Sequence, residues 1–213
     1  MATFNDPITG QPAGVDPLHK AIRVSLKPNE SLGWNSVGAQ SGLITGVAAN
    51  GALFSFRNLS ANPIVIRRVG VGFLCSTAFT TAQKMDFALI IARAFSASDS
   101  GGTAIALTGN NAKHRTSLGT PTSVDMRIAT TAALTAGTKT LDTNTIGIVG
   151  AWVGAAATII NTAPDNLLSH NAGDYPVVLA QNEGINIQNL TAMGAAGVGS
   201  FYLNIEFAEV ANY

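Results

Sequence analysis

The sequence feature that most constrains the fold is an alternating stretch close to the C-terminus, residues 199–210, which reads GSFYLNIEFAEV. Its apolar residues at every second position are Phe201, Leu203, Ile205 and Phe207. Side chains on a strand point alternately to its two faces, so the pattern predicts a strand with one buried and one solvent-facing side. Such a strand needs cover. The expected partner is Gly184–Leu190, which repeats the alternation, with the glycine-rich residues 192–199 as the turn of a hairpin.

The composition also favours strands over helices. Charged residues make up only 11% of the 213 residues, and the formal net charge is zero, whereas charged residues are about 25% of an ordinary globular protein. Solvent-facing helices need Glu, Lys and Arg, so the polar surface here must come from Ser, Thr, Asn and Gly. A near-neutral surface of this kind suits contact with other proteins. It offers no broad charged footprint for nucleic acid or for an anionic membrane.

The chain divides into an extended arm, residues 1–20, and one domain, residues 21–213. Pro7, Pro12 and Pro17 forbid a helix in the arm and remove backbone donors. The remaining residues are enough for one large domain with a sizeable core. Apolar side chains spaced along the arm, together with the two tryptophans of the chain, are the expected interface residues: Phe4, Pro7, Ile8, Val15, Leu18, Trp34 and Trp152.

Short runs with strand-like patterns, separated by turn residues, recur along the domain. Met85–Phe95 is apolar on both faces, which predicts a central strand covered twice, with a helix as the alternative. The segment Leu32–Gly51 is glycine-rich and reads as irregular. About ten short strands predict an all-β fold, a jelly-roll-like β-sandwich. The other expected strands are Ala21–Leu26, Leu53–Asn58, Ile64–Cys75, Ala104–Leu107, Val124–Ile128, Thr138–Leu141, Ile146–Val153, Thr158–Ile160 and Tyr175–Ala180.

Neither the single cysteine nor the longest apolar run indicates export or a membrane span. Cys75 excludes an intrachain disulfide, and its apolar surroundings predict a buried, unreactive thiol. The N-terminus lacks the basic start and apolar core of a signal peptide, so synthesis in a bacterial host cytoplasm is expected. Residues 146–160 are interrupted by glycines and are shorter than the ~20 residues of a spanning helix. Buried strands are the expected structure there.

No pattern for catalysis or cofactor binding stands out, so we expect no enzymatic activity, no cofactor and no metal. The three histidines are far apart in the sequence, and no nucleophile motif is present. Asp165, His170 and Asp174 gather oxygen and nitrogen donors that could hold a cation, but a polar turn with capping side chains explains the same residues more simply.

Several blocks resemble a group of uncharacterised proteins of tailed bacteriophages and prophages. The resemblance runs from about residue 50 to the C-terminus and implies a virion structural protein, on the capsid exterior or in another head-associated position. No catalytic residues come with it. The blocks are GNNAKHRTS (109–117), DMRIA (125–129), TAALTAGTKTLD (131–142), PVVLAQNEG (176–184) and EFAEVA (206–211).

Two functional hypotheses follow. The first is a capsid decoration (cement) or minor capsid protein, which bridges neighbouring subunits and stabilises the shell. Its partners are the major capsid protein or further copies of itself, for example in a trimer, with no role for nucleic acid or membrane. The second is a receptor- or glycan-binding module of a phage tail or fibre. The small number of tryptophans and tyrosines disfavours the second hypothesis, because sugar sites use exposed aromatic rings.

Overall fold

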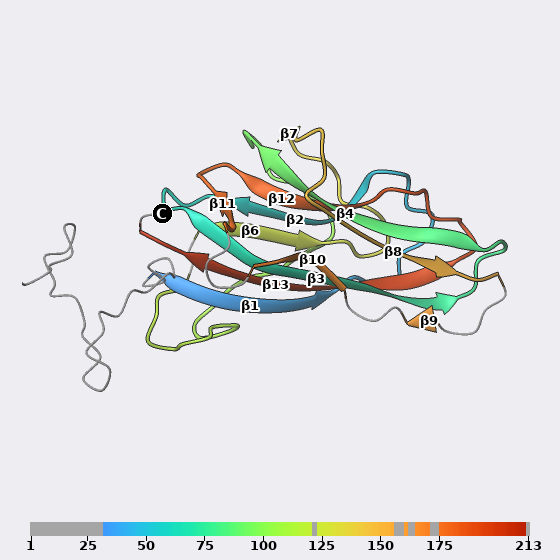
Figure 1. Cartoon of the computed structure of the whole chain (residues 1–213), viewed down its shortest axis with the longest axis horizontal. Helices are drawn as coiled ribbons and strands as arrows, with labels where there is room; N and C mark the ends of the chain where they lie inside the picture. The colour runs from blue at the N-terminus through green and yellow to red at the C-terminus, as the bar shows by residue number, and fades with distance from the viewer. Residues whose placement is uncertain (1–31, 121–122, 156–159, 162–164, 171–174, 212–213) are drawn as a thin grey trace, which may run out of the picture.

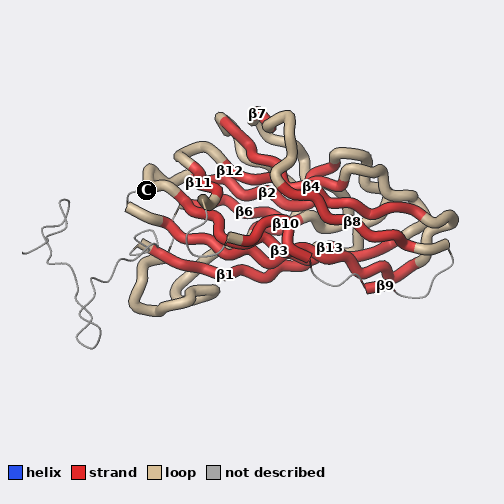
Figure 2. The backbone as a smooth tube through the Cα atoms, in the orientation of Figure 1, coloured by secondary structure: helices blue, strands red, loops and turns tan. Residues whose placement is uncertain are grey.

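The described part of the computed structural model, residues 32–120, 123–155, 160–161, 165–170 and 175–211, forms thirteen strands and no helix (Figure 2). The all-β prediction is therefore confirmed. The strands are β1 (Gly33–Gln40), β2 (Gly51–Asn58), β3 (Ile64–Thr77), β4 (Gln83–Arg93), β5 (Thr103–Ala104), β6 (Val124–Ile128), β7 (Thr140–Leu141), β8 (Gly147–Val153), β9 (Ile160–Asn161), β10 (Asp165–Ser169), β11 (Val177–Leu179), β12 (Gly184–Asn189) and β13 (Val198–Glu209).

Two antiparallel sheets pack together as a β-sandwich (Figure 1). The first, here called the β13 sheet, has the order β1-β13-β3-β10, and β9 and β11 also pair with β3. The second, the β12 sheet, has the order β5-β6-β2-β12-β4-β7, and β8 also pairs with β4. Long central strands in both sheets form the body, and the two-residue strands lie at the periphery.

The ladder between β13 and β3 is the backbone of the first sheet. Its register places Phe201 opposite Phe73 and Ile205 opposite Val69, and it continues to Glu209 opposite Ile64. A register shift between Glu206 and Phe207 marks a bulge, which increases the local twist of the pair. β1 then pairs along the other edge of β13, from Gly33 to Gln40.

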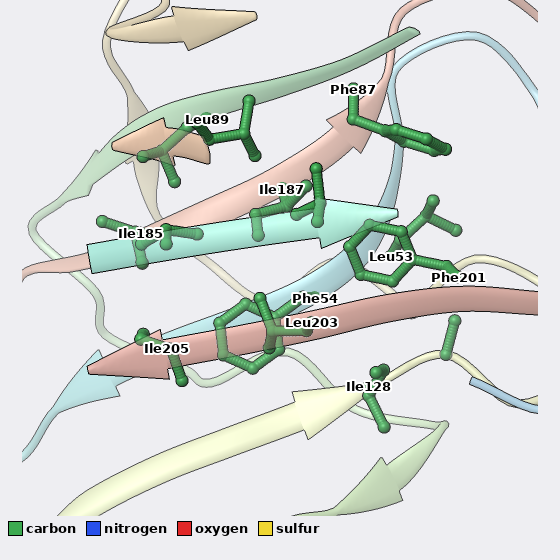
Figure 3. Close-up of a cluster of buried hydrophobic side chains, with 14 of the residues drawn as sticks. Leu53, Phe54, Phe87, Leu89, Ile128, Ile185, Ile187, Phe201, Leu203 and Ile205 are labelled. Atoms are coloured by element: carbon green, nitrogen blue, oxygen red, sulfur yellow. The ribbon is translucent and has the colours of Figure 1, made fainter. Parts of the chain in front are cut away.

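The core lies between the two sheets and is built from alternate residues of their facing strands. Phe201, Leu203, Ile205 and Phe207 of β13 are all at most 1% exposed. The ring of Phe207 meets Phe56 of β2 edge to face at a centroid distance of 5.1 Å, and Phe201 meets Phe87 of β4 at 5.2 Å. Figure 3 shows Ile185, Ile187, Phe87 and Leu89 gathered over Phe201, Leu203 and Ile205. The predicted common core of β13 with the Met85–Phe95 strand is confirmed.

The predicted hairpin between Gly184–Leu190 and the C-terminal strand is wrong. β12 pairs with β2 and β4 in the opposite sheet, whereas β13 pairs with β1 and β3. Residues 190–197 therefore cross from one sheet to the other. The physical reason is that each strand has an apolar face, and apolar faces remove more surface from water when they are stacked than when they lie side by side.

Other boundaries differ from the sequence-based prediction in smaller ways. Leu32–Gly51, expected to be irregular, contains β1, which is held by its pairing with β13 despite its weak apolar pattern. Asp165 begins β10 instead of lying in a turn. Met85–Phe95 is a central strand as predicted, and the helical alternative is wrong. The expected strand Ala21–Leu26 and residues 158–159 of another lie outside the described residues.

Replacing Phe207 by alanine should lower the free energy of unfolding by about 3–5 kcal/mol, because the ring is fully buried and its removal leaves a cavity against Phe56. Urea denaturation of the purified protein measures this. Asn204→Ala is the control on the same strand: its side chain is exposed, and the change should be within about 0.5 kcal/mol. Equal effects of the two substitutions would contradict the assignment of faces on β13.

Candidate functional site

The outward face of β8 carries an exposed apolar stripe, formed by alternate residues that begin just before the strand. Ile146 is 39% exposed, Ile148 56% and Trp152 71%. The intervening side chain Val149 and the following Val153 turn toward the core. β8 pairs with β4 through a register that puts Ile148 opposite Ala88 and Trp152 opposite Lys84. Residues 146–160 were predicted to be buried strands; β8 is a strand, but its inner residues are half-buried except for the buried Val153, and its outer residues are exposed.

A glycine and an ion pair complete the surroundings of the stripe. Gly150 lies between Ile148 and Trp152 and presents no side chain; a Cβ there would meet Asp86 Cβ at 3.4 Å. Its partner on β4 is Asp86. The Asp86 carboxylate forms a 2.6 Å ion pair with Lys84 and accepts a 2.9 Å hydrogen bond from the Thr191 N–H. Burial acts to raise the pKa of Asp86, but these donors lower it overall. With its neighbouring charges neutralised, the stripe suits contact with another apolar protein surface.

Trp34, the other predicted interface tryptophan, lies on the outer face of the opposite sheet, so the structure does not bring the two together. Its ring stacks on His114 at 4.6 Å, and the Arg67 guanidinium lies over it at 5.5 Å. Its Nε1–H donates to Glu206 Oε1 at 3.0 Å. It also packs against the buried residues Val65, Ala208 and Val210. The protein's own side chains therefore engage the ring, which points to a structural role.

His114, for which the sequence predicted no role, belongs to a loop that covers the open edge of β1. The Ser36 N–H donates to the Ala112 carbonyl at 2.8 Å, and the His114 N–H donates to the Trp34 carbonyl at 2.9 Å. Figure 1 shows this light-green loop beside β1. Sheet edges left uncovered invite pairing with other chains. No sequence signal indicates the contact, because the loop follows β5 in the other sheet.

The remaining predicted site residues do not assemble into a site within the described residues. Phe4, Pro7, Ile8, Val15 and Leu18 lie outside them, as does Asp174. Asp165 is exposed, and no group of three or more potential metal-ligating side chains occurs in the described part of the chain.

A small cavity between neighbouring edges of the two sheets offers little room for a ligand. It measures about 70 Å³, lies where β3, β4, β8 and β10 meet, and is lined mainly by Val71, Met85, Phe87 and Val149. Binding sites for small molecules typically exceed about 300 Å³.

The part of the chain that the structure describes contains no helix long and apolar enough to cross a membrane.

Searches of protein-family models, of curated proteins and of solved structures find no match to this chain.

The two tryptophans should respond differently to substitution. Trp34→Ala should lower the free energy of unfolding by about 2 kcal/mol, because it removes packing against the cluster of Val65 and Ala208. Trp152→Ala should change it by no more than about 0.5 kcal/mol, since the side chain is 71% exposed. Chemical denaturation of both variants provides the comparison, and a large loss of stability in the Trp152 variant would show that this ring is part of the fold.

Cys75 should not react with a thiol reagent in the native protein. The side chain is 2% exposed, and burial raises the pKa of its thiol, so the reactive thiolate is scarce. Its Sγ–H also donates to the Thr77 carbonyl at 3.1 Å. Labelling followed by absorbance should be slow in buffer and complete in denaturant. Rapid labelling without denaturant would contradict the burial.

Proposed function

We propose that the protein is a bacteriophage virion structural protein, a capsid decoration or minor capsid protein that attaches to the major capsid protein or to its own copies. The observation that carries this proposal is the exposed stripe of Ile146, Ile148 and Trp152 on a rigid two-sheet body. The resemblance of the sequence blocks to phage and prophage proteins supplies the setting. The virion is then the site of action, and the host cytoplasm the site of synthesis.

The path of the chain supports a jelly-roll form of the sandwich. Leaving aside the short strands and β6, the β13 sheet reads β1-β13-β3-β10 and the β12 sheet reads β2-β12-β4-β8. From β1 to β4, each successive strand lies in the other sheet. β4 then pairs with β8 within the β12 sheet. The chain changes sheets again before β10, before β12 and before β13. Jelly rolls, in which two sheets are wound in this manner, are common in viral capsid proteins and in lectins.

The stripe has the properties of an anchor for protein contact. Tryptophan is among the residues most often responsible for a large share of binding energy, and Trp152 is 71% exposed. Residues 146–152, in an extended strand, span roughly 20 Å. A stripe of that length covers less area than the ~800 Å² that each partner buries in a standard interface. The apolar residues of the arm can supply further area. Repetition over a shell adds avidity.

The glycan-binding alternative has less support among the described residues. Sugar sites stack their ligand on free aromatic rings. The Trp34 ring is engaged by His114 and Arg67. Trp152 and Tyr175 are exposed, but the strand that holds Trp152 and the strand that follows Tyr175 belong to different sheets. Trp152 lies opposite Lys84 at the start of β4, whereas β11, which follows Tyr175, pairs with the start of β3, so the two rings form no shared platform.

The number of copies in purified virions tests the proposal. Quantitative mass spectrometry should find the protein in a copy number comparable to that of the major capsid protein. A handful of copies per particle would favour the tail module, and absence from particles would overturn the virion assignment altogether.

Substitution of the stripe should weaken attachment without unfolding the protein. The double variant Ile148→Ser, Trp152→Ser should bind undecorated capsids, or its own copies, about 30-fold more weakly, because loss of a central tryptophan anchor costs about 2 kcal/mol. Co-sedimentation measures the affinity. The matched control is Gln40→Ser, Asn204→Ser on the exposed face of the β13 sheet, which should bind like the wild type. Equal binding by all three proteins would move the interface elsewhere.

A further inference from the structure

Three buried polar side chains converge on the outer side of the β12 sheet. Lys139 Nζ donates to Asp99 Oδ1, and Asn186 Nδ2 donates to Asp99 Oδ2 at 2.9 Å. The Asp99 side chain is fully buried, that of Lys139 is 5% exposed, and Asn186 is 0% exposed. One carboxylate therefore holds an amine on one of its oxygens and a carboxamide on the other, away from water.

Covering segments create this dry site. Asn186 lies in the middle of β12, opposite Ser55 of β2 and Ile90 of β4. Asp99 and Lys139 come from the segments that follow β4 and precede β7, and the two segments are joined by the 2.9 Å hydrogen bonds between Ser100 and Thr135. The buried ring of Phe95 lies 5.4 Å from Lys139 Nζ.

The hydrogen bonds fix the orientation of the Asn186 carboxamide. An ionised carboxylate can only accept, so the NH₂ group must face Asp99. The opposite atom, Asn186 Oδ1, accepts a 3.3 Å hydrogen bond from Gln188 Nε2. The carbonyl is thus polarised by a donor, and Asp99 is held in place by a further 2.7 Å hydrogen bond from the Gly137 N–H.

We propose that Lys139 and Asn186 form an intramolecular isopeptide bond, with Asp99 as the proton-transfer group. Burial acts to raise the pKa of Asp99, but hydrogen bonds from Lys139, Gly137 and Ser55 lower it overall, so the resting carboxyl is ionised. Transfer of one proton from Lys139 to Asp99 gives a minor neutral pair, which avoids the cost of two buried charges. The resulting neutral amine of Lys139 is a nucleophile. The donor Gln188 stands where negative charge develops on the carboxamide oxygen as the amine adds.

The reaction balances without an oxidant, a reductant or a cofactor. Asp99 accepts a proton from the Lys139 ammonium, and Nζ then forms a bond to Cγ of Asn186. As the addition product collapses, the bond from Cγ to Nδ2 breaks, and Asp99 relays the proton that Nζ gives up to the departing nitrogen. The products are a secondary amide and ammonia, which leaves as ammonium once it takes up the remaining proton, and Asp99 is again a carboxylate.

The bond would tie the covering segments to the central strand of the sheet. It would join residue 139 to residue 186 and close a covalent loop that contains β7 to β11 and the start of β12. Cross-links of this kind restrict the unfolded chain and thereby favour the folded state. The proposal does not depend on the virion role, although a covalently closed body suits a protein that bears mechanical load.

Intact-mass spectrometry of the full-length wild-type protein, unfolded in denaturant, tests the proposal. The protein should be lighter than its sequence by one molecule of ammonia. Proteolytic mapping should recover the Lys139 and Asn186 peptides as one branched species. Lys139→Arg and Asp99→Asn should each restore the full mass, and Lys139→Arg should also lower the thermal midpoint by roughly 10 °C.

One other source of the same mass loss needs a control. The sequence Asn50–Gly51 can lose ammonia by closing to a succinimide, but mild alkali hydrolyses that ring and leaves an isopeptide bond intact. A loss that disappears in alkali, or an unmodified wild-type mass, overturns the proposal. Loss of one water with a Lys139–Asp99 linkage also overturns it, because Asp99 would then be the acceptor instead of the proton relay.

Discussion

The antiparallel ladder between β13 and β3 is the contact on which the rest of the structure depends. Its twelve-residue strand β13 carries β1 on its other edge, and β3 carries β9, β10 and β11. The inner face of the same ladder supplies Phe201 and Phe207, whose rings meet Phe87 and Phe56 across the core. One ladder thus organises its own sheet by hydrogen bonds and fixes the second sheet by apolar burial. Removal of either ring affects both layers.

The polar side chains on the two outer faces of the sandwich differ in their exposure to solvent. Over the β13 sheet, side chains such as Ser36, Gln40 and Asn204 are exposed. Over the β12 sheet, Asn186 and Gln188 are buried beneath covering segments and satisfied by Asp99 and by each other. Buried polar groups are tolerated only when they are hydrogen-bonded. The covering segments supply the hydrogen-bond partners that Asn186 needs. An amine, a carboxylate and a carboxamide therefore lie together in one site shielded from water.

The strand alternation that builds the core also produces the surface from which function is inferred. In β13 the second face is polar and suits solvent. Along β8 and the residue before it, the second face contains Ile146, Ile148 and Trp152, and they remain exposed in the described structure. The proposed attachment to other proteins rests on this localised apolar stripe, whereas the loop over the β1 edge limits pairing of that edge with other chains.

The sequence by itself determined the all-β class, the faces of β13 and the central position of β4, because period-two patterns and paired apolar faces depend only on neighbours in the chain. It also identified Cys75 as buried. It did not determine which strands pair: β12 was assigned to a hairpin with β13, and β1 was missed. Nor did it find His114 on Trp34, or Asp99 between Lys139 and Asn186. These contacts join residues far apart in the chain, so only the stacking of the two sheets and the burial of their polar groups decided them.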